Sequence, residues 1–128
     1  MRLSYVDTSA AMKLIVDEPE SVALAEALGS DRRLVASWLL HTELHCASGR
    51  HPQEIPLAAV QAVLNTMNLV DLTRGDMLAA GTHAPLRSND AIHLAVAIRL
   101  GTDEMVTYDG ELAEAAKAAG LAILAPGA

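Results

Sequence analysis

The sequence predicts an α/β protein, a three-layer sandwich with helices on both faces of a central, mostly parallel sheet. Short runs of β-compatible residues alternate with longer apolar helical patterns along the whole chain, as in chains built from βαβ units. Four acidic residues lie where this fold brings strand ends and helix starts to one edge. The 128 residues suffice for one core and are too few for two, so we expect a single domain over 1–128.

The first part of the chain is expected to hold a strand, two helices and a second strand. Residues 3–7 favour a strand, because β-compatible residues run into an acid that small hydroxyl residues follow. Residues 10–16 favour a helix that stops before a proline, and residues 21–28 favour a helix that a glycine ends. Residues 33–37 are again compatible with a strand.

The middle of the chain is expected to hold two helices and a third strand. Residues 38–48 suit a helix that Gly49 closes. Pro56 can occupy the first turn of a helix that continues over residues 57–64, because a backbone N–H is not needed there. Residues 68–72 then favour a strand.

Two helices with candidate caps follow. Thr73 is a candidate N-cap for a helix over 76–82, since a hydroxyl can accept from the free backbone N–H groups of a first turn. Ser88 or Asn89 is the candidate cap of a helix over 91–98. That helix is apolar nearly all round, so we expect it to be buried.

The last part of the chain returns to strands. Residues 104–108 favour a strand that runs into an acid, and residues 111–119 favour a helix that Gly120 terminates. Residues 121–124 favour a final short strand. This alternation predicts the layered sheet architecture and argues against a helix bundle.

Composition and charge limit the classes of function. Hydrophobic residues make up 52% of the chain and aromatic residues only 2%, so we expect a core of small and aliphatic side chains. A net charge of −7 argues against a protein that grips nucleic acid by broad electrostatic attraction. It does not exclude a nuclease, because a bound divalent cation changes the local sign, and Lys13, Arg32 and Arg87 are candidates for a local rim that binds phosphates.

Targeting and redox signals are few. Cys46 is the only cysteine, which excludes an intrachain disulfide and a site with several thiolates. The N-terminus lacks a basic segment followed by an apolar signal core, and no apolar run approaches the ~20 residues of a membrane span. We therefore expect a cytoplasmic protein.

Asp7, Glu43, Asp90 and Asp109 are the four acids on which a functional hypothesis rests. Hard divalent cations prefer oxygen ligands, and carboxylates that converge without an ion repel and raise one another's pKa. The cluster therefore makes physical sense chiefly as a cation site. For a phosphodiester, a bound cation polarises the phosphoryl oxygen and lowers the pKa of a water, so no side-chain nucleophile is required.

Each of these acids also has an ordinary structural interpretation. Asp7 can cap the helix that follows it, and Glu43 can be a solvent-facing helix residue. Asp90 can stabilise a helix dipole, and Asp109 can form a turn in which Glu111 offers a second acid. Their joint occurrence in one topology favours a site, with Asp109 as its loosest member.

Three histidines do not indicate a zinc site. His41 and His45 share one helix face, whereas Glu43 is rotated from His41 by about 200° at about 100° per residue and stands at the wrong position for an HExxH motif. If Glu43 faces the other acids, these two histidines point elsewhere. His93, on an apolar helix, favours a hydrogen-bonded core histidine over a metal ligand.

Four short segments carry a family resemblance. They are Val6-Asp7-Thr8-Ser9, Glu43 in a central helix, Ser88-Asn89-Asp90-Ala91-Ile92-His93-Leu94-Ala95, and Val106-Thr107-Tyr108-Asp109. In order, spacing and local context they resemble the PIN-domain family, particularly the VapC toxins of bacterial VapBC toxin–antitoxin pairs. Asn89 departs from the family pattern, in which an apolar residue often precedes the third acid.

The resemblance implies a Mg²⁺- or Mn²⁺-dependent endoribonuclease that hydrolyses phosphodiester bonds of single-stranded or looped RNA with a metal-activated water. It implies that the four acids, Asp7, Glu43, Asp90 and Asp109, form the catalytic and metal-binding quartet. Thr8, Ser9 and Thr107 would orient an acid, a water or a phosphate. The resemblance also implies a VapB-type antitoxin as partner and a homodimer.

The sequence supports two alternative functions less well. A PIN-fold module with degraded catalysis would bind RNA or a protein partner in the same crevice, and the presence of all four acids favours an enzyme over it. A phosphatase-like hydrolase acting on small phosphoesters lacks support, because no phosphate-cradling glycine loop or Asp-x-Asp follows the first predicted strand.

Overall fold

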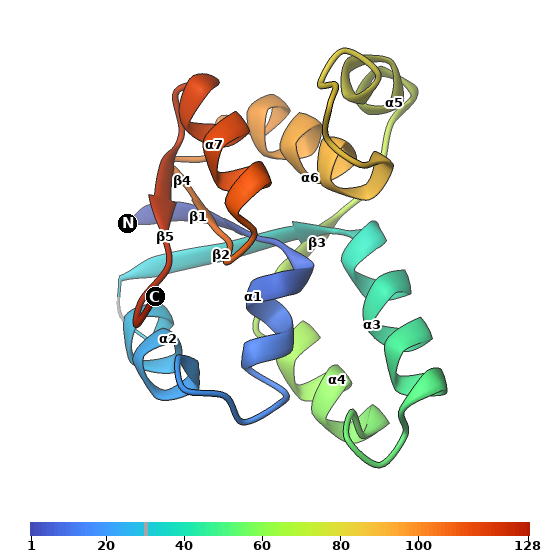
Figure 1. Ribbon diagram of the computed structural model, residues 1–128, viewed down its shortest axis with the longest axis vertical. Coiled ribbons are helices and arrows are strands. Elements are labelled where there is room, and N and C mark those ends of the chain that lie inside the picture. Colours follow the sequence, from blue (N-terminus) through green and yellow to red (C-terminus); the bar gives the residue numbers. More distant parts are fainter. Residues whose placement is uncertain (30) are drawn as a thin grey trace.

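The computed structural model describes residues 1–29 and 31–128. Its centre is a sheet of five strands, all parallel, in the order β3-β2-β1-β4-β5 (Figure 1). The strands are β1 (Arg2–Val6), β2 (Arg32–Ser37), β3 (Asn68–Val70), β4 (Glu104–Val106) and β5 (Ala122–Leu124). The predicted α/β class with a central, mostly parallel sheet is confirmed, and among the described residues the sheet is parallel throughout.

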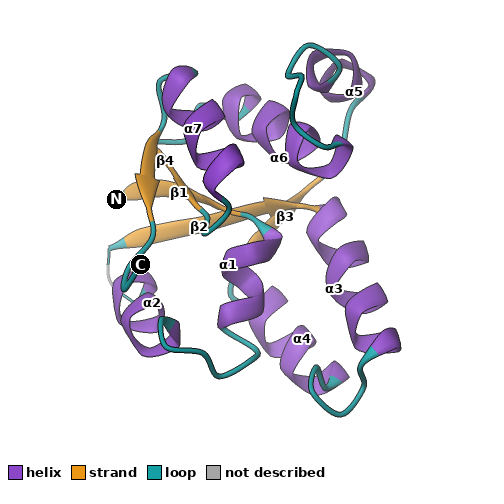
Figure 2. Ribbon diagram, in the orientation of Figure 1, coloured by secondary structure: helices purple, strands orange, loops and turns teal. Residues whose placement is uncertain are grey.

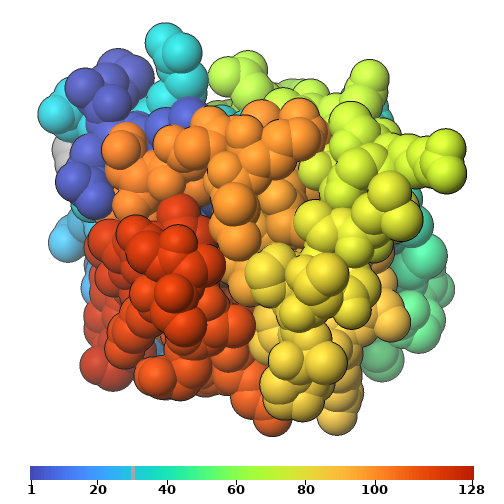
Figure 3. Space-filling model, turned by 90° about the horizontal axis from the view of Figure 1, so that it is seen from above, coloured from blue at the N-terminus to red at the C-terminus, as the bar shows by residue number. Residues whose placement is uncertain are grey.

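Helices cover both faces of this sheet (Figure 2). They are α1 (Thr8–Lys13), α2 (Ser21–Leu28), α3 (Trp38–Arg50), α4 (Leu57–Leu64), α5 (Arg74–Ala80), α6 (Ser88–Arg99) and α7 (Gly110–Ala118). Helices α1 to α4 lie on one face, while α6 and α7 cover the other and α5 packs beside α6 (Figure 1). Seen from above, α6 in orange and α7 in red lie side by side over that second face (Figure 3).

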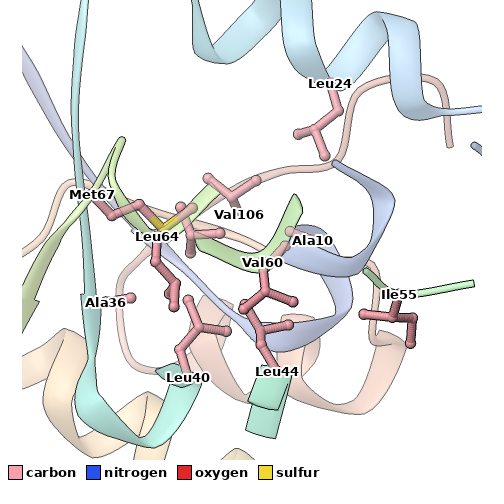
Figure 4. Packing of buried hydrophobic residues seen from close by; sticks show 12 residues of the cluster. Ala10, Leu24, Ala36, Leu40, Leu44, Ile55, Val60, Leu64, Met67 and Val106 are labelled. Carbon is pink, nitrogen blue, oxygen red and sulfur yellow. The ribbon is translucent and has the colours of Figure 1, made fainter. Parts of the chain in front are cut away.

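The buried sheet separates two hydrophobic clusters, one on each of its faces. Alternate residues of a strand point to opposite faces, so Val6 and Val106 pack in one cluster while Tyr5 and Met105 pack in the other. In the first cluster, side chains from α3 and α4 gather around Ala36 of the sheet (Figure 4). Covering both faces explains why the strand sequences are apolar with almost no polar alternation.

A parallel sheet brings the carboxyl ends of all its strands to one edge. The backbone N–H of Asp7 donates to the carbonyl of Val106 at 3.2 Å, so the ends of β1 and β4 lie side by side. Helices α1, α3 and α7 begin at or just after the ends of β1, β2 and β4. The first turns of helices from distant parts of the sequence therefore surround this edge.

Some predicted helix ends differ from those observed. Helix α3 continues through Gly49 to Arg50, because a glycine only weakens a helix and nothing forces a turn before the loop at Pro52. Pro56 is the N-cap of α4 and does not lie in its first turn. Thr73 caps α5 as predicted, in a capping box with Asp76.

The start of α6 was predicted wrongly. Ser88 and Asn89 are the first two residues of the helix, and its N-cap is Arg87, which makes no side-chain capping bond. The Asn89 side chain points to another element, where its amide donates to Glu43 at 3.4 Å. A tertiary contact thus replaces the local capping bond that the residue type favours.

Glu104 organises the opposite, amino-terminal edge of the sheet. Its buried carboxylate accepts from the Ser4 hydroxyl at 2.6 Å, from Arg32 at 2.7 Å and from Arg2 at 3.1 Å. Arg32 therefore belongs to this edge and not to a phosphate-binding rim beside the four acids. None of the helices described for residues 1–29 and 31–128 is long and apolar enough to cross a membrane.

Candidate active site

Asp7 is buried at the carboxyl end of β1, where it is also the N-cap of α1. One carboxylate oxygen, Oδ1, accepts from the backbone N–H of Ala10 at 3.0 Å. The hydroxyl of Ser9 donates to Oδ1 at 2.8 Å, and the hydroxyl of Thr107 donates to Oδ2 at 2.6 Å. The capping interpretation of Asp7 is therefore confirmed and leaves its role in a site open as a prediction, and its carboxylate is fixed from two elements.

The same hydroxyl groups tie α1 to the loop after β4. Ser9 Oγ accepts from the backbone N–H of Tyr108 at 2.9 Å, and Thr107 Oγ1 accepts from the backbone N–H of Asp109 at 3.1 Å. Burial raises the pKa of the Asp7 carboxyl, and the bonds from Thr107, Ala10 and Ser9 offset part of that rise. These bonds favour the ionised form of a carboxylate that its surroundings penalise.

Glu43, in the second turn of α3, is held by side chains from two other helices. Its Oε1 accepts from Thr8 Oγ1 at 2.7 Å and lies 2.6 Å from Nε2 of His93. Burial alone would raise the pKa of Glu43, but the bonds from His93, Thr8 and Asn89 bring it below the ordinary value. Glu43 is therefore a half-buried carboxylate kept ionised by donors from α1 and α6.

A buried hydrogen-bond chain extends from Glu43 into the sheet. His93 is fully buried, and its Nδ1 lies 2.7 Å from the hydroxyl of Tyr5. The Tyr5 hydroxyl in turn lies 3.3 Å from Ser37 Oγ. Burial raises the pKa of Tyr5, so its hydroxyl is neutral at pH 7. The prediction that His93 is a hydrogen-bonded core histidine is confirmed, and its contact with Glu43 makes it part of the site.

Asp90 lies half-buried in the first turn of α6. Within residues 1–29 and 31–128, its carboxylate has no hydrogen-bond or ion-pair partner. Burial raises its pKa first, and the negative charges of Asp109 and Asp7 raise it further. Asp90, in α6, thus lies under the influence of the carboxylates that cap α1 and α7, and it is the one without a donor.

Asp109 is the N-cap of α7, where its Oδ1 accepts from the backbone N–H of Leu112 at 2.9 Å. It lines an open cleft of about 450 Å³ together with Asp90, Arg87, Gly110 and Glu111. The structure thus brings Asp109 to the same cleft as Asp90, which Glu111, the other acid of its turn, also lines.

The four predicted acids therefore meet at one edge. The charges of Asp109, Asp7 and Glu43 all act on Asp90, and Glu43 is also bound by Thr8 and His93. In the part of the chain that the structure describes, no three His, Cys, Asp or Glu side chains are close enough to share a metal ion. Which of these acids bind a metal remains a prediction.

Tyr5 and His93 are the site residues that sequence reasoning left out of the site. The sequence feature that could have indicated each residue is its spacing from a predicted acid. His93 is three residues after Asp90 and so shares its helix face, while Tyr5 is two residues before Asp7 on the same strand side. What the sequence does not reveal is that these two side chains point at each other from different elements.

Other candidates for the site lie elsewhere. Lys13 forms ion pairs with Glu18 at 3.2 Å and Glu20 at 3.0 Å, which removes it as a free phosphate-binding residue. His41 and His45 stack on each other with ring centroids 4.0 Å apart, on a different face of α3 from Glu43. As expected from their spacing, they point away from the acids.

Comparison with known proteins decides the family. The family model described as the PIN domain matches residues 4–118. The chain belongs to the PIN-domain family. The matched range includes all four acids as well as Tyr5, His93 and the hydroxyl residues around Asp7.

Relatives in this family include VapC proteins of Mycobacterium tuberculosis. The chain is 38% identical to ribonuclease VapC46, in an alignment that covers 98% of this chain and 99% of the relative. It is 41% identical to ribonuclease VapC35, with 96% of each chain covered. The chain and these relatives are therefore similar along nearly their whole length.

Several solved structures share the fold. The crystal structure of Mycobacterium tuberculosis VapC20, described as a sarcin-ricin loop cleaving toxin, superposes with a TM-score of 0.75 at 19% identity, covering 96% of this chain and 99% of that one. A toxin–antitoxin complex from Klebsiella pneumoniae gives 0.72 at 20% identity, covering 96% and 97%. At these identities the similarity concerns the fold.

Proposed function

We propose that this PIN-domain protein is a VapC-type toxin, a Mg²⁺- or Mn²⁺-dependent endoribonuclease that hydrolyses RNA phosphodiester bonds. The observation that carries the proposal is Asp90, a half-buried carboxylate without a donor that lies within the electrostatic influence of Asp7 and Asp109. Such an arrangement is stabilised by a cation of high charge. The relatives at 38% and 41% identity are named ribonucleases, which supports RNA as the substrate class.

The donor chemistry fits a hard divalent cation. Carboxylate oxygens of Asp7, Asp90 and Asp109 would hold the ion, for which these side chains would have to come closer together than they lie in this structure. Glu43 would add negative charge beside them. When bound, the ion supplies Lewis acidity toward the phosphoryl oxygen and lowers the pKa of a water. Hydrolysis by such a water should leave a 5′-phosphate and a 3′-hydroxyl.

The protein's own groups prepare this site before substrate arrives. Thr107 and Ser9 hold the Asp7 carboxylate in one orientation, and His93 and Thr8 do the same for Glu43. Preorganised groups save the reorganisation that would otherwise occur during the reaction. These hydroxyl groups thus orient acids, as the family resemblance implies.

Incubating the protein with single-stranded and hairpin RNA tests the proposed reaction. Cleavage should require Mg²⁺ or Mn²⁺, should stop on addition of a chelator, and should be lost in Asp90→Asn, which keeps the shape and removes the charge. Exposed Glu114→Gln on α7 is the matched control and should cleave normally. Cleavage that persists in Asp90→Asn or in chelator would overturn the metal-dependent mechanism. A wild-type protein that binds RNA or a partner and does not cleave would leave the binding module as the alternative.

We further infer a VapB-type antitoxin partner, a homodimer and a cytoplasmic location. Among the proteins of similar fold are several toxin–antitoxin complexes, such as that from Klebsiella pneumoniae, which supports the first of these. Co-expression with a VapB-type antitoxin and co-purification would test the partner. Sedimentation of the protein alone would test the dimer, and a monomer at all concentrations would contradict it.

A further inference from the structure

The chain leaves its one tryptophan partly exposed. It contains one Trp, two Tyr and no Phe. Tyr5 is fully buried and Tyr108 is half-buried beneath Lys13, whereas Trp38, the first residue of α3, is 45% exposed. A large aromatic surface in water is unfavourable unless a partner covers it. The surroundings of Trp38 indicate what kind of partner fits.

Two histidines continue the aromatic surface along one face of α3. The ring centroids of Trp38 and His41 are 4.9 Å apart, and those of His41 and His45 are 4.0 Å apart at an interplanar angle of 24°. The Nδ1 of His45 donates to the carbonyl of His41 at 2.7 Å, which fixes the last ring. Burial and the neighbouring His45 lower the pKa of His41, so this ring stays neutral to lower pH than an ordinary histidine.

This aromatic row borders a pocket of about 470 Å³ between α3, α4 and the start of β3. The pocket has an apolar side, formed by Leu64, Met67 and Leu69, and three amide side chains, Gln61, Asn65 and Asn68. Amides offer donors and acceptors together, as the edges of nucleobases do. No acidic residue lines the pocket, although the chain has a net charge of −7, so a polyanion meets little repulsion here.

The pocket is connected to the candidate active site through Ser37. Trp38 follows Ser37, whose hydroxyl lies 3.3 Å from that of Tyr5, the first member of the buried chain to His93 and Glu43. Glu43 lies on the same helix, rotated from Trp38 by roughly 140° at about 100° per residue. An RNA strand bound at the four acids would therefore reach Trp38 by crossing the first turn of helix α3. The diameter of an α-helix is about 10 Å.

We propose that Trp38, His41 and His45, with the amides of Gln61, Asn65 and Asn68, bind one unpaired base of the RNA substrate. The proposal rests on the proposed ribonuclease function and assigns it a substrate contact a few nucleotides from the cleaved bond. The base stacks on the indole, and the amides contact its edge. Stacking tolerates every base, so sequence preference would come from the amides.

The single tryptophan allows a direct measurement. In the Asp90→Asn variant with Mg²⁺, titration with single-stranded RNA should quench the indole fluorescence, because all of this emission comes from Trp38. A duplex of the same sequence should quench much less, since its bases are already stacked. Emission that changes with protein concentration and not with RNA would overturn the proposal and assign this face to a second copy of the chain.

Kinetics with altered RNA test the position of the base. Removing single bases along a cleaved oligonucleotide should find one abasic position that raises KM about five- to 150-fold, the range expected for one stacked base. Trp38→Ala should lose affinity equally and should be insensitive to that abasic position, while Trp38→Phe should restore most binding. Leu78→Ala, which trims an exposed side chain on α5, is the control.

The outcomes separate this inference from the proposed function. If wild-type protein cleaves RNA and no abasic position raises its KM more than that of Trp38→Ala, the proposed base site is contradicted. The proposed nuclease function is then unaffected. If wild-type protein does not cleave RNA, the proposed function fails, and the fluorescence titration still decides whether RNA binds here. Circular dichroism tests whether Trp38→Ala is folded. If this variant does not fold, Trp38→Phe and the abasic scan of the wild type decide the question.

Discussion

At the scale of single residues, hydroxyl groups determine how the acids are presented. Asp7 is buried, and its carboxylate is fixed by Ser9 and Thr107 in addition to a backbone N–H. A hydroxyl that both donates to a carboxylate and accepts from the next loop, as Thr107 does, sets position as well as charge. Such residues are sensitive to changes that preserve shape and remove the polar atom.

Thr107→Val is such a change. The variant should lose about 1–3 kcal/mol of unfolding free energy, because buried polar groups lose their partner. RNA cleavage should fall about 10- to 100-fold, as it does when partners of site ligands are removed. Denaturant unfolding and cleavage rates measure the two effects. Thr107→Ser keeps the hydroxyl and should retain most of the unfolding free energy and most of the cleavage rate. Equal losses in Thr107→Ser and Thr107→Val would contradict the role given to the hydroxyl.

His93→Phe tests the support of Glu43. The bond from His93 helps to hold the pKa of Glu43 below its ordinary value, so the variant should let Glu43 protonate at a higher pH. The acidic limb of the pH–rate profile should therefore move to higher pH, with activity at neutral pH reduced at least about tenfold. A profile unchanged in shape would contradict this coupling. His83→Phe, in the loop before α6, is the control.

Asp7, Asp90 and Asp109 were predictable from sequence because each adjoins the start of a helix or the end of a strand, whereas Glu43, in the second turn of α3, was indicated by the family resemblance. Asp7 follows β1 and Asp109 precedes α7, positions that local sequence indicates directly. Tyr5 and His93 were not predicted as site residues, because their roles depend on side chains that meet across elements. The local sequence pattern indicates where a residue lies in a strand or helix, but it does not indicate the side chain that a buried residue will meet.

At the scale of elements, the amino-terminal edge of the sheet depends on one carboxylate. Glu104 of β4 joins Arg2 of β1, Arg32 of β2 and Ser4 of β1. Burial alone would raise the pKa of Glu104, but its bonds to Ser4, Arg32 and Arg2 bring it below the ordinary value. Three strands are therefore tied at the edge opposite the acids.

This pairing makes stability depend on pH. Since the folded pKa of Glu104 is lowered, its contribution is fully present above the ordinary carboxyl pKa of about 4.3 and is lost as the pH falls through the lowered value. Glu104→Gln should reduce unfolding free energy by about 1–3 kcal/mol at pH 7 and by less in acid. Chemical denaturation from pH 3 to pH 7 measures this. Exposed Glu114→Gln should change little at any pH.

Element boundaries were predicted less well than element types. Helix α2 was placed correctly because Gly29 ends it. Helix α3 continues past Gly49, where a helix end was expected. Helix α6 includes Ser88 and Asn89, which were expected to cap it, because this helix is buried and Asn89 contacts Glu43 instead. The bounds depend on such tertiary contacts, which a single sequence does not contain.

At the scale of the whole molecule, the charges at the carboxyl edge connect cation binding to stability. Asp7, Asp90 and Asp109 come from three helices, and their repulsion acts against the folded state. Mn²⁺ should therefore raise the melting temperature, by several degrees at a concentration about 100 times its Kd. Scanning calorimetry with Mn²⁺ or chelator measures the shift. Asp90→Asn should melt higher than wild type in chelator and respond less to Mn²⁺.

The class of architecture was predictable and the order of strands was not. Alternating strands and helices imply a parallel sheet, but they do not say that β1 lies at its centre between β2 and β4. That arrangement depends on pairings between residues about 30 and 100 positions apart, such as Ser4 with Leu34 and with Glu104.

The bond from Thr107 to Asp7 spans 100 residues of sequence. During synthesis, a ribosome that has made β1, α3 and α6 has already supplied Asp7, Glu43 and Asp90, yet the carboxylate of Asp7 still lacks the hydroxyl that fixes it. The loop after β4, which brings Thr107 and Asp109, emerges after all of these elements. For a protein proposed to cut RNA, a chain that stops before this loop therefore lacks both Asp109 and the hydroxyl that fixes Asp7.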